Sequence, residues 1–135
     1  MADRSEELQP LLLDAHAFLW ALDDSEQLGA NVRAALQSGR QAWLSSATVW
    51  ELGIKTLIGR LALPVPLREL VQRAAVDGGV RVLDVTPEHA LRASELPMIH
   101  KDPFDRMLIA QAMTERLTLA TRDGRIEGYD VATLW

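Results

Sequence analysis

The sequence contains no cysteine. It therefore offers neither a disulfide framework nor a thiolate zinc site, and nothing in it points to an oxidising compartment. It also lacks an apolar run long enough to cross a membrane, and its start lacks the basic and then apolar order of a signal peptide. These absences predict a soluble, cytoplasmic protein without a membrane partner.

An excess of positive charge is missing as well. The chain has 14 Lys and Arg against 19 Asp and Glu, a formal net charge of −5, so we do not expect it to hold nucleic acid mainly by long-range attraction to phosphates. A nuclease is not excluded, because cations bound to clustered acids reverse the local charge. A Gly-rich phosphate loop, a nucleophile elbow and a Walker lysine are absent too.

The length and the apolar pattern predict one α/β domain. A chain of 135 residues with 48% hydrophobic content is long enough for one core and too short for two ordinary domains. Residues 1–9 are polar without periodicity and predict a disordered leader, which leaves 10–135 as the domain. Beyond them, β-like runs alternate with helical patterns, which favours an α/β sandwich with a mainly parallel sheet. The expected strands are 11–14, 42–45, 80–85, 117–121 and, more weakly, 131–134.

Helix signals fill the gaps between these runs. Thr86-Pro87 and Asp102-Pro103 each place an N-cap residue before a proline at the first helical position. The expected helices are 15–22, 29–36, one around 47–55, one from 66 that Gly78 and Gly79 end, and those that start after residues 86 and 102.

Four acids stand near one predicted edge of the sheet. Asp14 ends the first strand and Asp123 follows the fourth, and ligands bind at the carboxyl edge of open α/β sheets. Glu51 lies in the helix after the second strand, and Asp105 in the first turn of the helix before the fourth. Because neighbouring buried carboxylates need a neutralising cation, these four are candidate ligands of a divalent metal.

Each acid also has a purely structural explanation. Asp14 suits a helix N-cap, and Asp105 suits a capping box or the positive end of the helix dipole. Glu51 can pair with Lys55 four residues later, and Asp123 suits a turn. Taken singly, none of the four decides between a structural and a metal-binding role.

Taken together, the segments around these acids resemble the PIN domain of VapC-type toxins, the ribonuclease half of bacterial toxin–antitoxin pairs. The resemblance runs from Leu11 to Trp135 and rests on four ordered segments, LLLDAHAFLW (11–20), SSATVWELGIK (45–55), HKDPFDRMLIAQA (100–112) and LTLATRD (117–123). It implies a compact, PIN-like three-layer α/β/α sandwich.

The resemblance also implies a function. According to this resemblance, four acids bind Mg²⁺ or Mn²⁺, and a water that the metal activates hydrolyses RNA phosphodiester bonds. The four acids are Asp14, Glu51, Asp105 and Asp123. A folded VapB-like antitoxin partner, a toxin homodimer and a toxin–antitoxin hetero-oligomer are implied as well. One departure is Ala15, which stands where a small hydroxyl residue is usual and removes a possible hydrogen bond to a metal-bound water.

Further polar residues accompany the acids. Thr121 is a candidate to hydrogen-bond a water or a ligand, and Arg106 and Arg122 are candidates to contact RNA phosphates or to support the site, although solvated ion pairs fit them equally well. His16 is expected to pack or to hydrogen-bond rather than to bind metal, because no second His or Cys shares a ligand spacing with it.

Two other functions stay open at this point. One is a receiver-like signalling domain with an acidic Mg²⁺ pocket, which Asp84 at the end of a strand supports and which the lack of adjacent acids after the first strand opposes. The other is a non-catalytic PIN-like binding module, which a metal titration without binding would favour.

Overall fold

The structure is a computed structural model that describes residues 9–135, so the predicted leader lies outside the described residues apart from Gln9. The elements in chain order are β1 (Leu11–Leu13), α2 (Ala15–Leu22), α3 (Ala30–Gln37), β2 (Ala42–Ser45), α4 (Ser46–Leu57), α5 (Leu67–Val76), β3 (Arg81–Leu83), α6 (Pro87–Glu95), α7 (Pro103–Glu115), β4 (Thr118–Ala120), the 3₁₀ helix η1 (Gly124–Gly128) and β5 (Thr133–Leu134).

The five strands form one parallel sheet in the order β3-β2-β1-β4-β5. The central strand β1 pairs Leu12 with Trp43 of β2 on one side and with Leu119 of β4 on the other. The chain therefore first builds outward from β1 through β2 and β3, and then returns to the opposite side through β4 and β5. This reversal places a topological switch point between β1 and β4, where α/β sheets bind ligands at the carboxyl edge.

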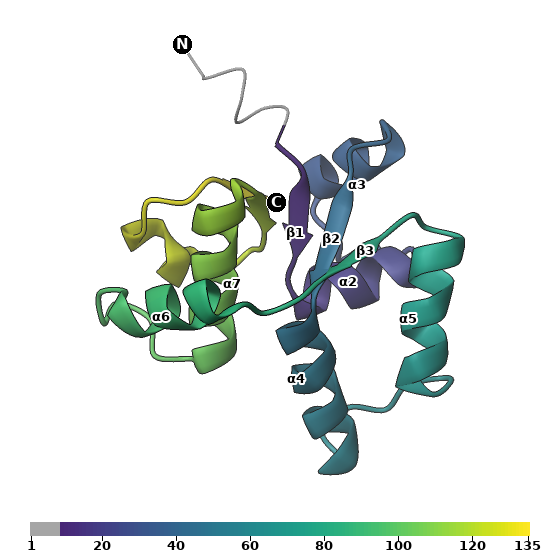
Figure 1. Ribbon diagram of the computed structural model, residues 1–135. Coiled ribbons are helices and arrows are strands. Elements are labelled where there is room, and N and C mark those ends of the chain that lie inside the picture. Colours follow the sequence, from purple (N-terminus) through teal and green to yellow (C-terminus); the bar gives the residue numbers. More distant parts are fainter. Residues whose placement is uncertain (1–8) are drawn as a thin grey trace.

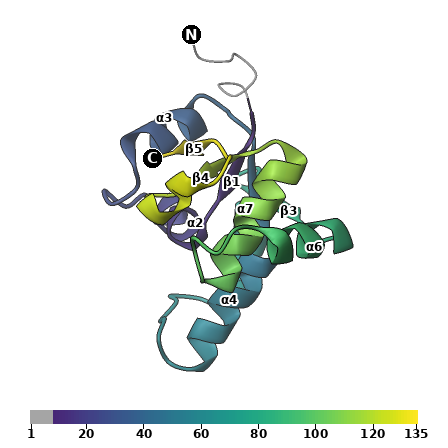
Figure 2. The ribbon, with the colours of Figure 1, turned by 90° about the vertical axis from the view of Figure 1, so that its left-hand side faces the viewer.

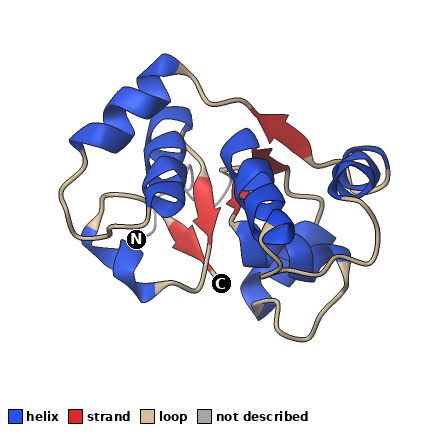
Figure 3. Ribbon diagram, turned by 90° about the horizontal axis from the view of Figure 1, so that it is seen from below, coloured by secondary structure: helices blue, strands red, loops and turns tan. Residues whose placement is uncertain are grey.

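Helices cover both faces of the sheet, as Figures 1 and 3 show. Leu11 and Leu13 of β1 face the core that α2, α3 and α5 cover, whereas Leu12 faces the core under α6, α7 and η1. All three leucines are buried, because a parallel sheet with two covered faces excludes water from both. The predicted α/β/α sandwich is confirmed, and the sheet is parallel throughout.

Two helices with capped N-termini begin at the carboxyl edge of the sheet. The Ser45 side chain accepts from the backbone N–H of Ala47 and starts α4, which extends beyond the sheet in Figures 1 and 2. Asp102 starts α7 as the sequence predicts, because its carboxylate accepts from two backbone N–H groups and Pro103 follows it. No helix in residues 9–135 is both long and apolar enough to span a membrane.

Candidate metal centre

The four predicted acids line a single cavity at the carboxyl edge, with a volume of about 400 Å³. They come from different parts of the chain. Asp14 follows β1, Glu51 lies in α4, Asp105 lies in the first turn of α7, and Asp123 follows β4. Parallel strands end at the same edge of the sheet, which is why residues more than 100 positions apart meet here.

Asp14 both caps a helix and faces the cavity. Its Oδ1 accepts from the backbone N–H of Ala17, 2.8 Å away, and its carboxylate also accepts from the Thr121 hydroxyl. Burial raises the pKa of Asp14, although these hydrogen bonds oppose the shift. The capping role that the sequence suggested is real, and it leaves a costly buried charge beside the cavity.

Glu51 lies on the inner face of α4. The buried residues of α4 are Thr48, about one turn before Glu51, Glu51 itself and Leu52, which directly follows it, and only 9% of Glu51 is exposed. Its Oε2 accepts from Lys55 Nζ at 3.0 Å, so the pairing expected from the sequence exists. Trp50 does not help to bury it, since that side chain points outward and is 67% exposed.

Asp105 carries the most perturbed charge of the cavity. Burial and then the negative charge of Asp102 raise the pKa of Asp105 to about 6, and Glu51 and Asp123 add to the rise, while His100 opposes it. The raised pKa shows that burial and the neighbouring acids disfavour the charged form of Asp105 more than His100 favours it.

Asp123 has the opposite environment. Hydrogen bonds from the Arg125 side chain lower the pKa of Asp123 to about 2, against the opposing effect of burial. Arg125 is exposed and reaches the carboxylate with two N–H groups, Nε at 3.0 Å from Oδ1 and Nη2 at 2.9 Å from Oδ2. The Thr121 hydroxyl accepts from the Asp123 backbone N–H at 3.1 Å, so Thr121 connects the segments of Asp14 and Asp123.

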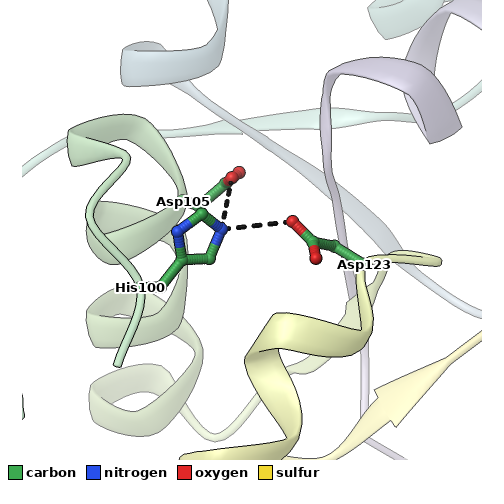
Figure 4. A group of neighbouring side chains, drawn as sticks. All are labelled: His100, Asp105 and Asp123. Atoms are coloured by element: carbon green, nitrogen blue, oxygen red, sulfur yellow. Dashed lines mark hydrogen bonds and ion pairs between the residues drawn. The ribbon is translucent and has the colours of Figure 1, made fainter. Parts of the chain in front are cut away.

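His100 stands between two of the acids, as Figure 4 shows. Its Nε2 lies 2.9 Å from Oδ2 of Asp105 and 3.1 Å from Oδ2 of Asp123. These three atoms lie within 4.8 Å of one another, a separation that one ion could bridge. His100 thus belongs to the centre, although the sequence argument did not include it.

The two predicted arginines occupy different places. Arg122 is exposed at the cavity wall and lies over the Trp20 ring, 4.7 Å from its centroid. Arg106 is buried, and its guanidinium donates to backbone carbonyls of the segment that carries His100, at Ala93, Leu96, Pro97 and His100. Burial rules out the solvated ion pair considered for Arg106, both of its Nη atoms are occupied by backbone carbonyls, and its support of the site stays a prediction.

Comparison with known proteins now adds to this geometry. The family model of the PIN domain matches residues 11–132. The chain belongs to the PIN domain family.

This PIN domain is similar to known proteins in sequence and in fold. It is 27% identical over 120 residues to Ribonuclease VapC22 of Mycobacterium tuberculosis, covering 88% of this chain and 91% of that protein. Its fold is similar to VapBC2 from Rickettsia felis bound to a promoter DNA fragment, with a TM-score of 0.68, 12% identity and coverage of 92% and 96%. It is also similar to a toxin–antitoxin complex from Klebsiella pneumoniae, with a TM-score of 0.64, 18% identity and coverage of 93% and 96%.

The donor set of this PIN domain fits a hard divalent cation. The cavity offers carboxylate oxygens, which such ions prefer, and the raised pKa values of Asp14 and Asp105 mark negative charge that the protein does not neutralise. Asp84, on which the receiver-like alternative rested, is exposed and is not among the residues that line the cavity.

Sequence reasoning missed His100 and Arg125. Each had one weak signal, since His100 stands two residues before the N-cap Asp102 and Arg125 two residues after Asp123. Spacing alone gave no reason to prefer them over other polar neighbours, because their contacts depend on how two loops meet in space.

Proposed function

We propose that this PIN domain is the toxin component of a toxin–antitoxin pair and acts as an endoribonuclease that depends on Mg²⁺ or Mn²⁺. The observation that carries the proposal is one cavity lined by four carboxylates from four parts of the chain, two of them with pKa values raised by burial. The similarity to a protein named as a ribonuclease supports the same conclusion.

The residues divide into three roles. Asp14 and Asp105 are the core ligands, because their charges have the least compensation, and Glu51 and Asp123 complete the acidic wall. A bound divalent ion supplies acidity to a water nucleophile and stabilises charge on the phosphoryl oxygens. Thr121 holds Asp14 through a hydrogen bond.

Cationic side chains at the cavity wall suit the phosphates of the substrate. Arg122 and Arg125 are both exposed and line the cavity, and the Arg122 guanidinium lies over the Trp20 ring. Their N–H groups match phosphate oxygens. If water attacks the phosphodiester, the products carry 5′-phosphate and 3′-hydroxyl ends.

A protein partner is the second part of the proposal. We expect an antitoxin and self-association into a homodimer. A toxin–antitoxin complex is named among the similar structures, and an apolar groove beside the metal centre supports an interface. That groove is lined by Ser46, Ala47, Trp50, Val85, Pro103, Phe104 and Met107.

The cleavage site is tested with conservative substitutions. Asp14→Asn and Asp105→Asn keep the shape of the side chain and remove a charged ligand, so each should lower Mn²⁺-dependent RNA cleavage on the order of 100-fold or more. Asp84→Asn is the matched control and should cleave as the wild type does. Circular dichroism confirms that each variant is folded.

Two outcomes would redirect the assignment. Unchanged cleavage in a folded Asp105→Asn variant contradicts the site. Wild-type protein that binds RNA, binds no Mn²⁺ and leaves the RNA intact supports a non-catalytic PIN module instead.

A further inference from the structure

Both ring nitrogens of His100 have defined partners inside the protein. Nδ1 accepts a hydrogen bond from the backbone N–H of Asp102 at 3.2 Å. A nitrogen that accepts from an N–H carries no proton, so the ring proton is on Nε2. Nε2 then donates toward Asp105 and Asp123, at 2.9 and 3.1 Å from their Oδ2 atoms (Figure 4).

The surrounding contacts hold this donor in place. The His100 backbone N–H donates to the Tyr129 hydroxyl at 2.8 Å, and that hydroxyl donates to the Pro97 carbonyl at 2.7 Å. The His100 carbonyl accepts from Arg106 at 3.1 Å. These contacts fix the His100 backbone, and because only 2% of the residue is exposed, a change of rotamer would also break the contacts of Nδ1 and Nε2 inside the protein.

The same proton argues against His100 as a metal ligand. Binding an ion through Nε2 requires a free lone pair on that nitrogen. Nε2 already carries the proton, and moving it to Nδ1 would set two N–H groups, that of Nδ1 and that of Asp102, against each other. The proximity of His100 to the two carboxylates therefore has another purpose.

We propose that His100 is a positioning residue of the metal centre. Its Nε2–H donates to the carboxylates of Asp105 in α7 and Asp123 in the loop after β4, and so keeps the two close enough to bind one ion. Without this donor the two carboxylates repel each other across the cavity before any ion arrives. The benefit to ion binding rests on the proposed function, whereas the donor role does not.

The ring proton is read directly by long-range ¹H–¹⁵N spectra of the histidine side chains in metal-free protein. The chain has three histidines, and the signal that disappears in His100→Gln identifies His100. We expect the Nε2–H tautomer, unchanged on addition of Mg²⁺. An Nδ1–H tautomer, or loss of the Nε2 proton when Mg²⁺ binds, overturns the proposal.

Ion binding is read by Mn²⁺ titration with electron paramagnetic resonance. His100→Leu removes the donor and should weaken Mn²⁺ binding by roughly 10- to 100-fold, the usual effect of losing a partner of a metal ligand. His100→Gln places an amide N–H near the position of Nε2, so it should bind within about threefold of the wild type. Rescue by Gln separates positioning from simple filling of space.

His89 provides a matched control. It is also fully buried, its Nδ1 accepts from the Thr86 backbone N–H at 3.0 Å, and its Nε2 lies 2.8 Å from Oε1 of Glu115, outside the acidic cavity. His89→Leu should lower thermal stability and leave Mn²⁺ affinity unchanged.

The failures of the two proposals are distinguishable. Wild-type affinity in a folded His100→Leu variant contradicts the positioning role alone. A wild-type protein that binds no Mn²⁺ contradicts the proposed function, and the tautomer spectrum then still decides the donor role. If His100→Leu does not fold, the His100→Gln titration and the spectrum decide it, because weak binding by Gln would contradict positioning by an N–H donor.

Discussion

At the scale of single residues, the two carboxylates that contact His100 have pKa values shifted in opposite directions. Burial and neighbouring acids raise the pKa of Asp105 to about 6, while hydrogen bonds from Arg125 lower the pKa of Asp123 to about 2. The difference comes from position, since Asp105 faces the acidic wall and Asp123 has a guanidinium beside it. The charged form of Asp105 is thus disfavoured, whereas that of Asp123 is stabilised.

The raised pKa of Asp105 predicts how stability depends on pH in the absence of metal. In the unfolded chain its pKa lies near 4, so the folded state binds the proton more tightly. The stabilising contribution is complete below pH 4 and is lost as the pH rises through 6. Asp105→Asn should therefore be more stable than the wild type at pH 7.5 by on the order of 2 kcal/mol, with a smaller difference at pH 4.5.

Urea unfolding in EDTA at both pH values measures this difference. The groups that face Asp105 and enter the comparison are Asp102, His100, Glu51 and Asp123. Equal stabilities of variant and wild type at pH 7.5 would contradict the electrostatic description of the cavity. Asp123 does not interfere, because its contribution is lost only as the pH falls from about 4 toward 2.

The identities of the acids could be predicted from the sequence, but their partners could not. Asp14 and Asp123 follow apolar runs that become β1 and β4, and the ends of parallel strands meet. His100 and Arg125 lie in loops whose path no periodicity describes. The sequence also offered capping or metal binding for Asp14 as alternatives, whereas the structure shows the cap on a side chain that faces the cavity.

At the scale of elements, local sequence signals predicted where helices begin and where strands lie. The Thr86 and Asp102 caps start α6 and α7 as expected, and the five apolar runs contain the five strands. Strand ends differ from the expected ones by at most two residues, and at β1 the difference arises because Asp14 caps α2 instead of extending the strand. The 3₁₀ helix η1 was not predicted, since only a turn signal marks it, and the Asp123 side chain starts it by accepting from the Arg125 backbone N–H.

The segment between α6 and α7 depends on one buried guanidinium. Arg106 donates to three backbone carbonyls there and to that of Ala93 in α6, so Arg106→Leu leaves buried acceptors unpaired and should lower the free energy of unfolding by about 3 kcal/mol. Because this segment carries His100, the variant should also lose Mn²⁺ affinity.

Urea unfolding measures the loss against Arg73→Leu, which removes only an exposed pair with Glu69 and should cost less than about 1 kcal/mol. A similar small loss of unfolding free energy in both variants would show that the segment between α6 and α7 does not depend on Arg106.

At the scale of the whole molecule, the proposed metal ion makes a net charge of −5 compatible with an RNA substrate. The acidic cavity repels phosphates when it is empty of cations, and divalent ions reverse that local field. Overall charge therefore said little about the site, which is why composition did not exclude a nuclease.

The apolar groove beside the centre predicts association. Trp50 is 67% exposed, and its ring meets that of Phe104 edge to face at 5.8 Å. Trp50→Glu places a charge in this surface and should shift the proposed homodimer toward monomer in light scattering after size exclusion. Leu57→Glu, at an exposed position outside the residues that line the groove, is the control. An unchanged mass for Trp50→Glu would place the interface elsewhere.

The central claim is that folding gathers distant acids around one divalent ion. Crystals of the protein grown with Mn²⁺ test it through an anomalous difference map collected at the manganese edge. We predict a peak about 2 Å from carboxylate oxygens of Asp14 and Asp105, and its loss in Asp105→Asn. A map with no peak in this cavity, or with the ion bound on another face, would contradict the account.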